Sequence, residues 1–407
     1  MTESEPGDLP LPIGGIRLGT VAAGIRKPGR DDLVLVELAP GTRCAAMFTR
    51  NAFCAAPVTV AREALAACDG MPRYLLINTG NANAGTGARG IADARACAAA
   101  VAAACGVDAS TVLPFSTGVI GEHLPVETLS RGIPAARHAL SPEGWTAAAR
   151  GIMTTDTRPK TASARVTCAG QAFCVTGMAK GAGMLRPDMA TMLAYIATDA
   201  AVAPALLQQI LRDAVETSFH RISVDGDTST NDACVLMATG TAGNAELDTL
   251  DGPQAQALAV AIRDVCVSLA QGLVRDGEGA SKFVGITVRE GRSVAECLDV
   301  AFTIAHSPLV KTALFASDPN WGRLLAAIGR AGLPDLDVNA VSLRLNGVLI
   351  AEYGCRAASY TEEQGAAAMA AGDIAIDIAL ARGEAVETVW TSDFSYDYVR
   401  INAEYRT

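Results

Sequence analysis

Hairpin signals are spread along this 407-residue chain, and they exclude a purely parallel architecture. Asn346-Gly347 lies between two strand-like runs, VSLRL and VLIAEYG, and predicts a two-residue hairpin turn. A second hairpin is predicted around residues 169–172, and a third around Arg382-Gly383, joining strands at 374–380 and 385–390. Adjacent antiparallel strands of this kind belong to α+β or all-β folds, so helix content decides between them.

Long apolar segments with helical periodicity also occur, at 91–105, 202–219 and 253–274. Helices and hairpins together predict an α+β fold built in layers. Thr361 and Gln364 have the spacing of a capping box before a helix at 366–371. Further elements are expected as strands at 32–39, 58–60, 74–77 and 221–224, and as a helix beginning at Ser141-Pro142.

Composition excludes several classes of protein. Half of the residues are hydrophobic and 19% are charged, which excludes disorder as the dominant state. The main Ala-rich stretch, 96–105, is too short to span a bilayer, so no membrane association is expected. The opening residues, MTESEPGDLPLP, lack a basic region followed by an apolar one. They predict no signal peptide and therefore a cytoplasmic protein.

Charge and cysteine spacing exclude further classes of protein. The chain has 33 basic and 43 acidic residues, a net charge of −10, and no basic run suited to nucleic acid. Its 11 cysteines show no C-x-x-C spacing, which argues against a disulfide framework or a zinc finger and agrees with a reducing compartment.

Two motifs resemble known sites only in part. Residues 85–90 fit G-x-G-x-x-G, but seven residues separate them from the preceding strand, so a Gly-rich loop is the better interpretation. Asp225-Gly-Asp-Thr-Ser approximates the D-x-D-x-T of aspartyl-phosphate phosphatases. The alternative, which we favour, is a turn at a strand end, capped by its own Asp and Thr side chains.

The segment from Lys180 to Asp199 carries the most chemical information. A Gly-rich loop leads through Pro187 to Ala190-Thr191 and then into an apolar run. Thr191 could simply be a β-branched strand residue. If the Ala190–Thr191 peptide is cut, however, Thr191 gains an α-amine with a pKa of about 8 beside its own hydroxyl. Such a residue can serve as nucleophile and base at once, without a histidine.

This segment resembles the autoprocessing region of the ornithine acetyltransferase (glutamate N-acetyltransferase) family of arginine biosynthesis. The resemblance extends over essentially the whole chain. It is carried by FTRNAFCAAPV (48–58), NTGNANAGTG (78–87), PFSTGVIGE (114–122), IMTTDT (152–157), VDGDTSTND (224–232), DGEGASKF (276–283), SPLVKTALFASDPNWGR (307–323) and INAEYRT (401–407).

The resemblance implies roles for individual residues. Cleavage between Ala190 and Thr191 would give an α chain, 1–190, and a β chain, 191–407, that begins with the nucleophile Thr191. Thr117 and Gly118 would form the oxyanion hole through a hydroxyl and a backbone N–H. The substrate contacts implied by the family pattern are Thr154, Lys180, Thr191, Glu278, Asn402 and Thr407.

The implied fold is an α/β sandwich with sheets stacked between helical layers, in an autoprocessed, N-terminal-nucleophile-like enzyme. The implied reaction moves the acetyl group of N2-acetylornithine to glutamate through an acetyl-Thr191 intermediate. No metal or redox cofactor is implied, and some members also use acetyl-CoA as donor, a choice the sequence leaves open.

Members of the family assemble as α2β2 heterotetramers, so the same assembly is expected here. Two alternatives stay open. One is a related autoprocessed aminopeptidase or amidase, in which water replaces glutamate, and the other is an uncleaved binding protein that uses the same loops.

Overall fold

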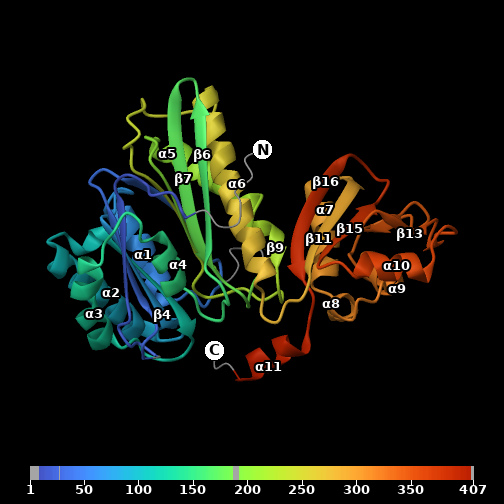
Figure 1. Ribbon diagram of the computed structural model, residues 1–407, viewed down its shortest axis with the longest axis horizontal. Helices are drawn as coiled ribbons and strands as arrows, with labels where there is room; N and C mark the ends of the chain where they lie inside the picture. Colours follow the sequence, from blue (N-terminus) through green and yellow to red (C-terminus); the bar gives the residue numbers. More distant parts are fainter. Residues whose placement is uncertain (1–8, 27, 187–191, 405–407) are drawn as a thin grey trace.

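The computed structural model describes residues 9–26, 28–186 and 192–404, and its elements stack in layers (Figure 1). An outer helical layer covers a first sheet, which packs on a second sheet. Helices α5 and α6 cover the far side of the second sheet, and a third sheet with its own helices lies beyond them (Figure 1). This is the layered α/β sandwich that the sequence predicted.

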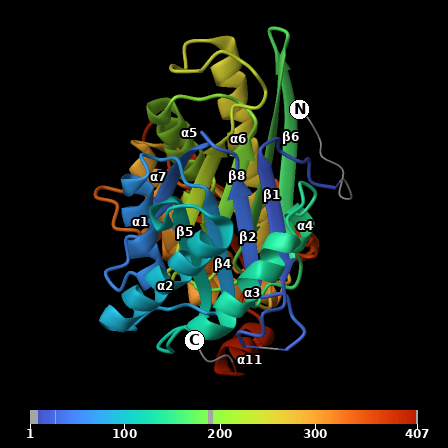
Figure 2. The same cartoon turned by 90° about the vertical axis from the view of Figure 1, so that its left-hand side faces the viewer.

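The first sheet has the strand order β1-β2-β4-β5. Its strands alternate their side chains between two apolar environments: Val34 faces the second sheet, whereas Leu33 and Leu35 face helices. Figure 2 shows α2 and α3 in front of this sheet. The bounds are β1 (Ile16–Val21), β2 (Leu33–Leu38), β4 (Tyr74–Asn81), β5 (Val112–Val119), α2 (Gly87–Cys105) and α3 (Val126–His138).

The second sheet, in the order β3-β10-β8-β7-β6, is buried on both faces at its centre. Every residue of β8 and β10 is buried, as expected for strands with a layer on each side. Tyr195 and Ala197 point to the first sheet, and Ala194 and Ile196 point to α5 and α6. The bounds are β3 (Arg43–Phe48), β6 (Lys160–Cys168), β7 (Gln171–Lys180), β8 (Leu193–Thr198) and β10 (Ala233–Ala238).

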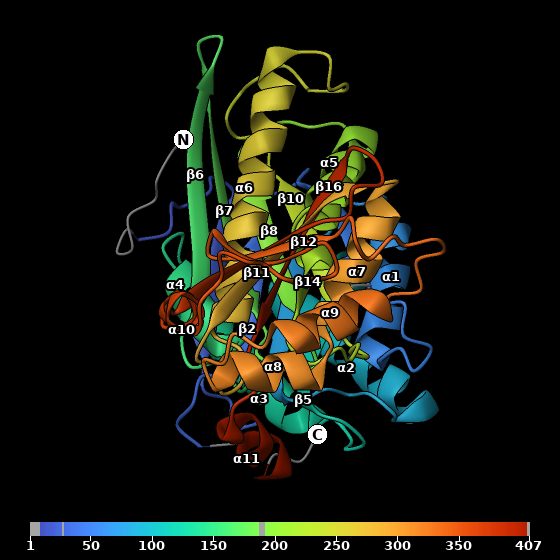
Figure 3. The same cartoon turned by 90° about the vertical axis from the view of Figure 1, so that its right-hand side faces the viewer.

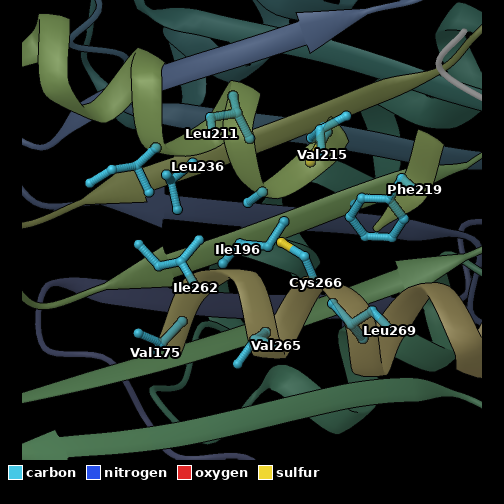
Figure 4. Packing of buried hydrophobic residues seen from close by; sticks show 14 of the residues in the cluster. Val175, Ile196, Leu211, Val215, Phe219, Leu236, Ile262, Val265, Cys266 and Leu269 are labelled. Carbon is cyan, nitrogen blue, oxygen red and sulfur yellow. The ribbon is translucent and has the colours of Figure 1, made fainter. Parts of the chain in front are cut away.

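Helices α5 (Pro204–Glu216) and α6 (Pro253–Arg275) form one core with the second sheet. Figure 4 shows Ile262 and Cys266 of α6 against Ile196 of β8 in that core. By length and composition α6 is apolar enough to cross a membrane, but half of its most apolar window is buried inside the protein. That burial is what a core helix requires.

The third sheet has the order β14-β13-β12-β15-β11-β16-β9, and Figure 3 shows α8 and α9 beside it. Val284, Ile286 and Val288 of β11 point into the core beneath these helices. The strands are β9 (Ile222–Ser223), β11 (Phe283–Gly291), β12 (Ser342–Leu345), β13 (Val348–Glu352), β14 (Cys355–Arg356), β15 (Asp373–Ala379) and β16 (Ala385–Ser392), and the helices are α7 (Val294–Ala305), α8 (Pro308–Phe315), α9 (Trp321–Gly329) and α10 (Glu362–Met369).

Three α-helices and two 3-10 turns complete the described part of the chain. Helix α11 leaves the end of β16 and lies at the bottom of Figure 1, next to the C-terminus. The aromatic rings of Phe394 and Tyr398 stack with centroids 4.7 Å apart and fix its start. The bounds are α1 (Ala56–Ala67), α4 (Trp145–Gly151), α11 (Tyr396–Glu404), and the 3-10 turns η1 (Ala109–Thr111) and η2 (Phe219–Arg221).

Several local predictions are confirmed. Asn346 and Gly347 have φ values of 43° and 82° between β12 and β13, as a two-residue hairpin turn requires. The 169–172 hairpin is also present, with its turn at Ala169-Gly170 between β6 and β7. Thr361 and Gln364 form a capping box, although α10 begins at Glu362, four residues earlier than predicted.

Three local predictions are wrong. Residues 58–60 belong to α1, because Pro57 and the surrounding alanines favour the first turns of a helix over a strand. Strands β15 and β16 do not pair with each other, since β11 lies between them. Ser141-Pro142 forms a turn, and α4 starts only at Trp145, because the Ser141 backbone pairs with Leu18 of β1.

One half-buried histidine, His306, makes the stability of the fold depend on pH. Nε2 of His306, after α7, lies 2.8 Å from Oγ of Ser223 in β9. Burial, reinforced by the charges of Arg186, Lys311 and Arg330, lowers the pKa of His306 from 6.5 to about 4. The unfolded chain therefore binds more protons between these two pH values, and folding is weakened as the pH falls through them.

We expect the free energy of unfolding to decrease from about pH 6.5 to about pH 4, and His306→Gln to remove part of that decrease. Urea unfolding at several pH values measures it. His138→Gln, on an exposed part of α3, is the control and should behave like the wild type. Identical pH profiles for His306→Gln and the wild type would contradict the prediction.

Candidate active site

An open pocket of about 610 Å³ lies where the first two sheets meet the start of the third sheet and α11. Its walls come from segments far apart in the sequence, so the pocket exists only in the folded chain. The predicted residues Thr117, Gly118, Thr154, Lys180, Glu278 and Asn402 all line it. The other lining residues are Ala82, Ile120, Thr155, Ala182, Gly183, Met184, Ser229, Thr230 and Asn231.

Thr117 and Gly118 lie near the end of β5, where its pairing with β4 is interrupted by a bulge at Gly80-Asn81. Gly118 has a φ of 136°, and a Cβ there would lie 2.4 Å from the carbonyl carbon of Gly80. Only glycine fits this position, so the backbone can adopt an unusual orientation at the pocket wall. The Gly118 backbone thus lines the pocket wall, and a backbone N–H is one kind of donor that an oxyanion hole uses.

Lys180, the last residue of β7, supports the Thr117 hydroxyl. Its Nζ donates to Oγ1 of Thr117 over 3.0 Å. An ammonium has no acceptor, so the hydroxyl must accept in this bond and keeps its own proton for another partner. Lys180 therefore orients Thr117 as a hydrogen-bond donor toward the pocket.

The Lys180 side chain is almost completely buried. Burial lowers its pKa below the ordinary value, and the ammonium of Lys160 acts in the same direction. The carboxylates of Asp156, Asp232 and Glu278 oppose this shift. Nearby carboxylates thus take the place of water in favouring the charged form of Lys180.

A buried ion cluster that sequence reasoning missed holds these segments together. Lys160 is paired with Asp156 and, at 2.5 Å, with Asp276, and all three side chains are less than 5% exposed. Asp156 also accepts the backbone N–H of Thr154 at 2.9 Å and of Gly181 at 2.8 Å. The cluster therefore fixes both Thr154 and the residue after Lys180.

The electrostatics of the cluster explain why Asp156 stays ionised. Burial by itself would raise the pKa of Asp156, but the ammonium groups of Lys160 and Lys180 outweigh burial and hold the pKa at about 2. The sequence signals for this cluster were weak. Asp156 lies within the family text IMTTDT, and Asp276 precedes Gly277-Glu278.

Glu278 reaches the pocket from the turn after α6. Its backbone N–H bonds to the carbonyl of Ala182 at 2.8 Å, and its Oε2 accepts from Nδ2 of Asn402 at 2.8 Å. A Cβ on Gly183 would lie 2.3 Å from the Glu278 carboxylate, so a larger residue there would displace this carboxylate from its present position. The C-terminal helix α11 is thereby joined to the pocket through Asn402.

The predicted cleavage site, Ala190 and Thr191, and the predicted contact Thr407 lie outside the described residues. The chain on both sides of Ala190 and Thr191 is held by hydrogen bonds to carboxylates. Backbone N–H groups of Met184 and Leu185 donate to the Asp225 carboxylate. This agrees with the interpretation of the 225–229 motif as a structural turn.

On the other flank, the Met192 N–H donates to Oδ1 of Asp232 at 3.1 Å. Burial raises the pKa of Asp232 well above its ordinary value, and its Oδ2 has no hydrogen-bond partner within the described part of the chain. Leu193 is the cross-strand partner of Lys180. The segment between Lys180 and Leu193 therefore leaves and re-enters the second sheet at one place, beside the pocket.

Comparison with known proteins identifies the family. The sequence profile of the ArgJ family matches residues 17–407. The chain belongs to the ArgJ family. The arginine biosynthesis bifunctional protein ArgJ of Pseudomonas syringae pv. tomato is 57% identical over 403 residues, covering 98% of this chain and 99% of the relative. The ArgJ protein of Methylococcus capsulatus is 57% identical over 396 residues, covering 97% and 96%.

Among solved structures, the ornithine acetyltransferase of Mycobacterium tuberculosis, complexed with ornithine, is 38% identical to this chain. The match covers 44% of this chain and 95% of that chain, with a TM-score of 0.39. Membership in the ArgJ family confirms the family resemblance found in the sequence, and it places the chain among the enzymes of arginine biosynthesis.

The ion cluster leads to a prediction about stability. Lys160→Met leaves two buried carboxylates without their cation, so we expect the free energy of unfolding to fall by about 3–5 kcal/mol. Urea unfolding measures this loss. Arg95→Met, which removes an exposed arginine paired with Glu63, is the matched control and should change stability by less than about 1 kcal/mol. Equal effects in the two variants would show that the cluster does not hold the fold.

Proposed function

We propose that this chain cleaves itself between Ala190 and Thr191 and then transfers the acetyl group of N2-acetylornithine to glutamate through an acetyl-Thr191 intermediate. The products are ornithine and N-acetylglutamate. The observation that carries the proposal is the pocket beside Lys180 and Leu193, where a supported hydroxyl, a strained glycine and a buried carboxylate come together. Thr191 precedes Leu193, the cross-strand partner of Lys180, by only two residues of the sequence.

In the first half-reaction, Oγ of Thr191 attacks the acetyl carbonyl carbon, and its proton passes to the Thr191 α-amine. The carbonyl oxygen becomes an oxyanion that accepts hydrogen bonds from the Thr117 hydroxyl and the Gly118 N–H. The C–N bond to ornithine then breaks. The α-ammonium of Thr191 returns the proton to the departing amine, which leaves acetyl-Thr191 and ornithine.

The second half-reaction reverses these steps with a new amine. The α-amine of glutamate attacks the acetyl carbon of acetyl-Thr191, the same oxyanion donors act again, and N-acetylglutamate leaves. Acetyl-CoA is a second donor within this proposal, since a thioester can acetylate Thr191 by the same attack. No step needs a metal or a redox cofactor.

Substrate recognition follows from charge. Glu278 supplies a buried carboxylate for the δ-ammonium of the ornithine moiety. We assign Thr154, Lys180, Asn402 and Thr407 to the remaining polar contacts, with Lys180 acting chiefly through Thr117. Cleaved α and β chains, 1–190 and 191–407, would remain together as an α2β2 heterotetramer in the cytoplasm.

Processing is the first prediction of this proposal. The purified protein should show two chains of roughly 20 and 22 kDa, in proportion to 190 and 217 of the 407 residues. Thr191→Ala should remain a single chain, because it lacks the hydroxyl that would attack the Ala190 carbonyl and break the peptide bond. Intact-mass spectrometry measures both. An uncut wild-type protein with full activity would contradict the mechanism.

The second prediction concerns Glu278. Glu278→Gln should raise the KM for N2-acetylornithine about tenfold or more, because a buried ammonium loses its charged acceptor. Ornithine formation gives the KM, and Glu363→Gln, an exposed change on α10, is the matched control. An unchanged KM would remove Glu278 from the site. In the same assay, release of acetate in place of N-acetylglutamate would favour the aminopeptidase or amidase alternative.

A further inference from the structure

A second pocket, of about 450 Å³, adjoins the first and shares Thr154 with it. Its other lining residues are Arg26, Arg30, Asp32, Thr79, Gly80 and Met153. Thr79 and Gly80 of β4 pair with Thr117 and Gly118 of β5. Adjacent strands are about 4.8 Å apart, so the second pocket begins one strand away from the proposed oxyanion hole.

Residues on either side of the arginines are held by hydrogen bonds. Both carboxylate oxygens of Asp32 are used by backbone N–H groups, those of Ala23 at 2.7 Å and Ile25 at 2.6 Å. Nη2 of Arg30 donates to the carbonyls of Met153 at 2.7 Å and Thr154 at 3.1 Å. Arg30 is thus joined to the wall that the two pockets share.

Arg26 is the cation best placed to receive a ligand. Gly80 has a φ of 92°, and a Cβ there would lie 2.8 Å from Cβ of Arg26, so glycine lets the arginine approach β4 closely. The Arg26 guanidinium is paired with Glu122 at 3.1 Å, and both side chains are more than a third exposed. A pair of this kind contributes little energy and opens easily to a competing carboxylate.

The proposed reaction needs such a cation. Its donor and acceptor both react at the α-nitrogen, which is an acetylated amide in N2-acetylornithine and a free amine in glutamate. Their side chains end in opposite charges, an ammonium in ornithine and a carboxylate in glutamate. The buried carboxylate of Glu278 suits the first and repels the second. The γ-carboxylate of an extended glutamate lies about 5 Å from its α-amine, a distance comparable to one strand spacing.

We infer that the second pocket binds the γ-carboxylate of the acceptor glutamate, with Arg26 as its charged partner and Arg30 as the residue that positions the shared wall. The two side-chain charges are then recognised on opposite sides of Thr154, ornithine by Glu278 and glutamate by Arg26. This inference rests on the proposed function and specifies how one site serves two substrates of opposite side-chain charge.

The test separates the two half-reactions. Mass spectrometry of the β chain follows acetyl-enzyme formation from N2-acetylornithine, and steady-state assays compare glutamate with glutamine as acceptor. Arg26→Gln should lower kcat/KM for glutamate about tenfold to a hundredfold, the range of a lost charge-assisted hydrogen bond. Its preference for glutamate over glutamine should shrink by the same factor, while the rate of acetyl-enzyme formation changes less than about threefold. Arg26→Lys should restore part of the preference.

Arg95→Gln is the matched control, because it removes the same charge from an exposed ion pair outside both pockets. Unchanged glutamate kinetics in Arg26→Gln would overturn the inference. Equal losses in both half-reactions would also overturn it, since they would assign Arg26 to the α-carboxylate that the two substrates share. A wild-type enzyme that forms no acetyl-enzyme would instead refute the proposed function, and the inference with it.

Discussion

The ammonium of Lys160, held between Asp156 and Asp276, is the interaction on which the candidate site depends. The three charges come from the start of β6, the loop before it and the end of α6. Buried charges are tolerated only when they are paired and hydrogen-bonded, so these segments must meet in one arrangement. That arrangement sets the backbone of Thr154 and Gly181 and places Glu278 two residues beyond Asp276. A change in the cluster would therefore move several pocket walls together.

The layers of the fold supply the rigid frame around this cluster. The sandwich of two sheets brings the end of β5 against the end of β7, so that Lys180 can reach Thr117 across the interface between the sheets. Helix α6 passes from the central core to the turn that carries Glu278, and α11 returns to that turn from the third sheet (Figure 1). Gly279, with a φ of 67°, leaves room for α11, because a Cβ there would lie 2.5 Å from Oγ of Ser395.

Carboxylates hold the chain on both sides of the proposed cleavage site. Asp225 accepts the N–H groups of Met184 and Leu185, and Asp232 accepts that of Met192. Asp225 begins the 225–229 motif that the sequence predicted as a turn, and Asp232 lies three residues beyond that motif. Burial raises the pKa of both carboxyls, because it disfavours their charged forms. A self-cleaving segment needs such fixed ends, because the attacking hydroxyl and the carbonyl must stay within reach of each other.

Local sequence was sufficient wherever short-range chemistry decides the outcome. Asn346-Gly347 specified its hairpin because its backbone angles suit a two-residue turn, and Thr361 with Gln364 specified a helix start through paired caps. The resemblance to family text supplied the candidate residues, and those that are described line one pocket. Partner choice between distant segments could not be obtained in this way. The pairing of β15 and β16 with β11, the burial of Lys160 between two aspartates, and the approach of Arg26 to Gly80 join residues far apart in the chain. Such contacts depend on which layers pack together and on which charged side chains are buried. Both depend on interactions between segments that are distant in the sequence, so a local stretch of sequence does not determine them.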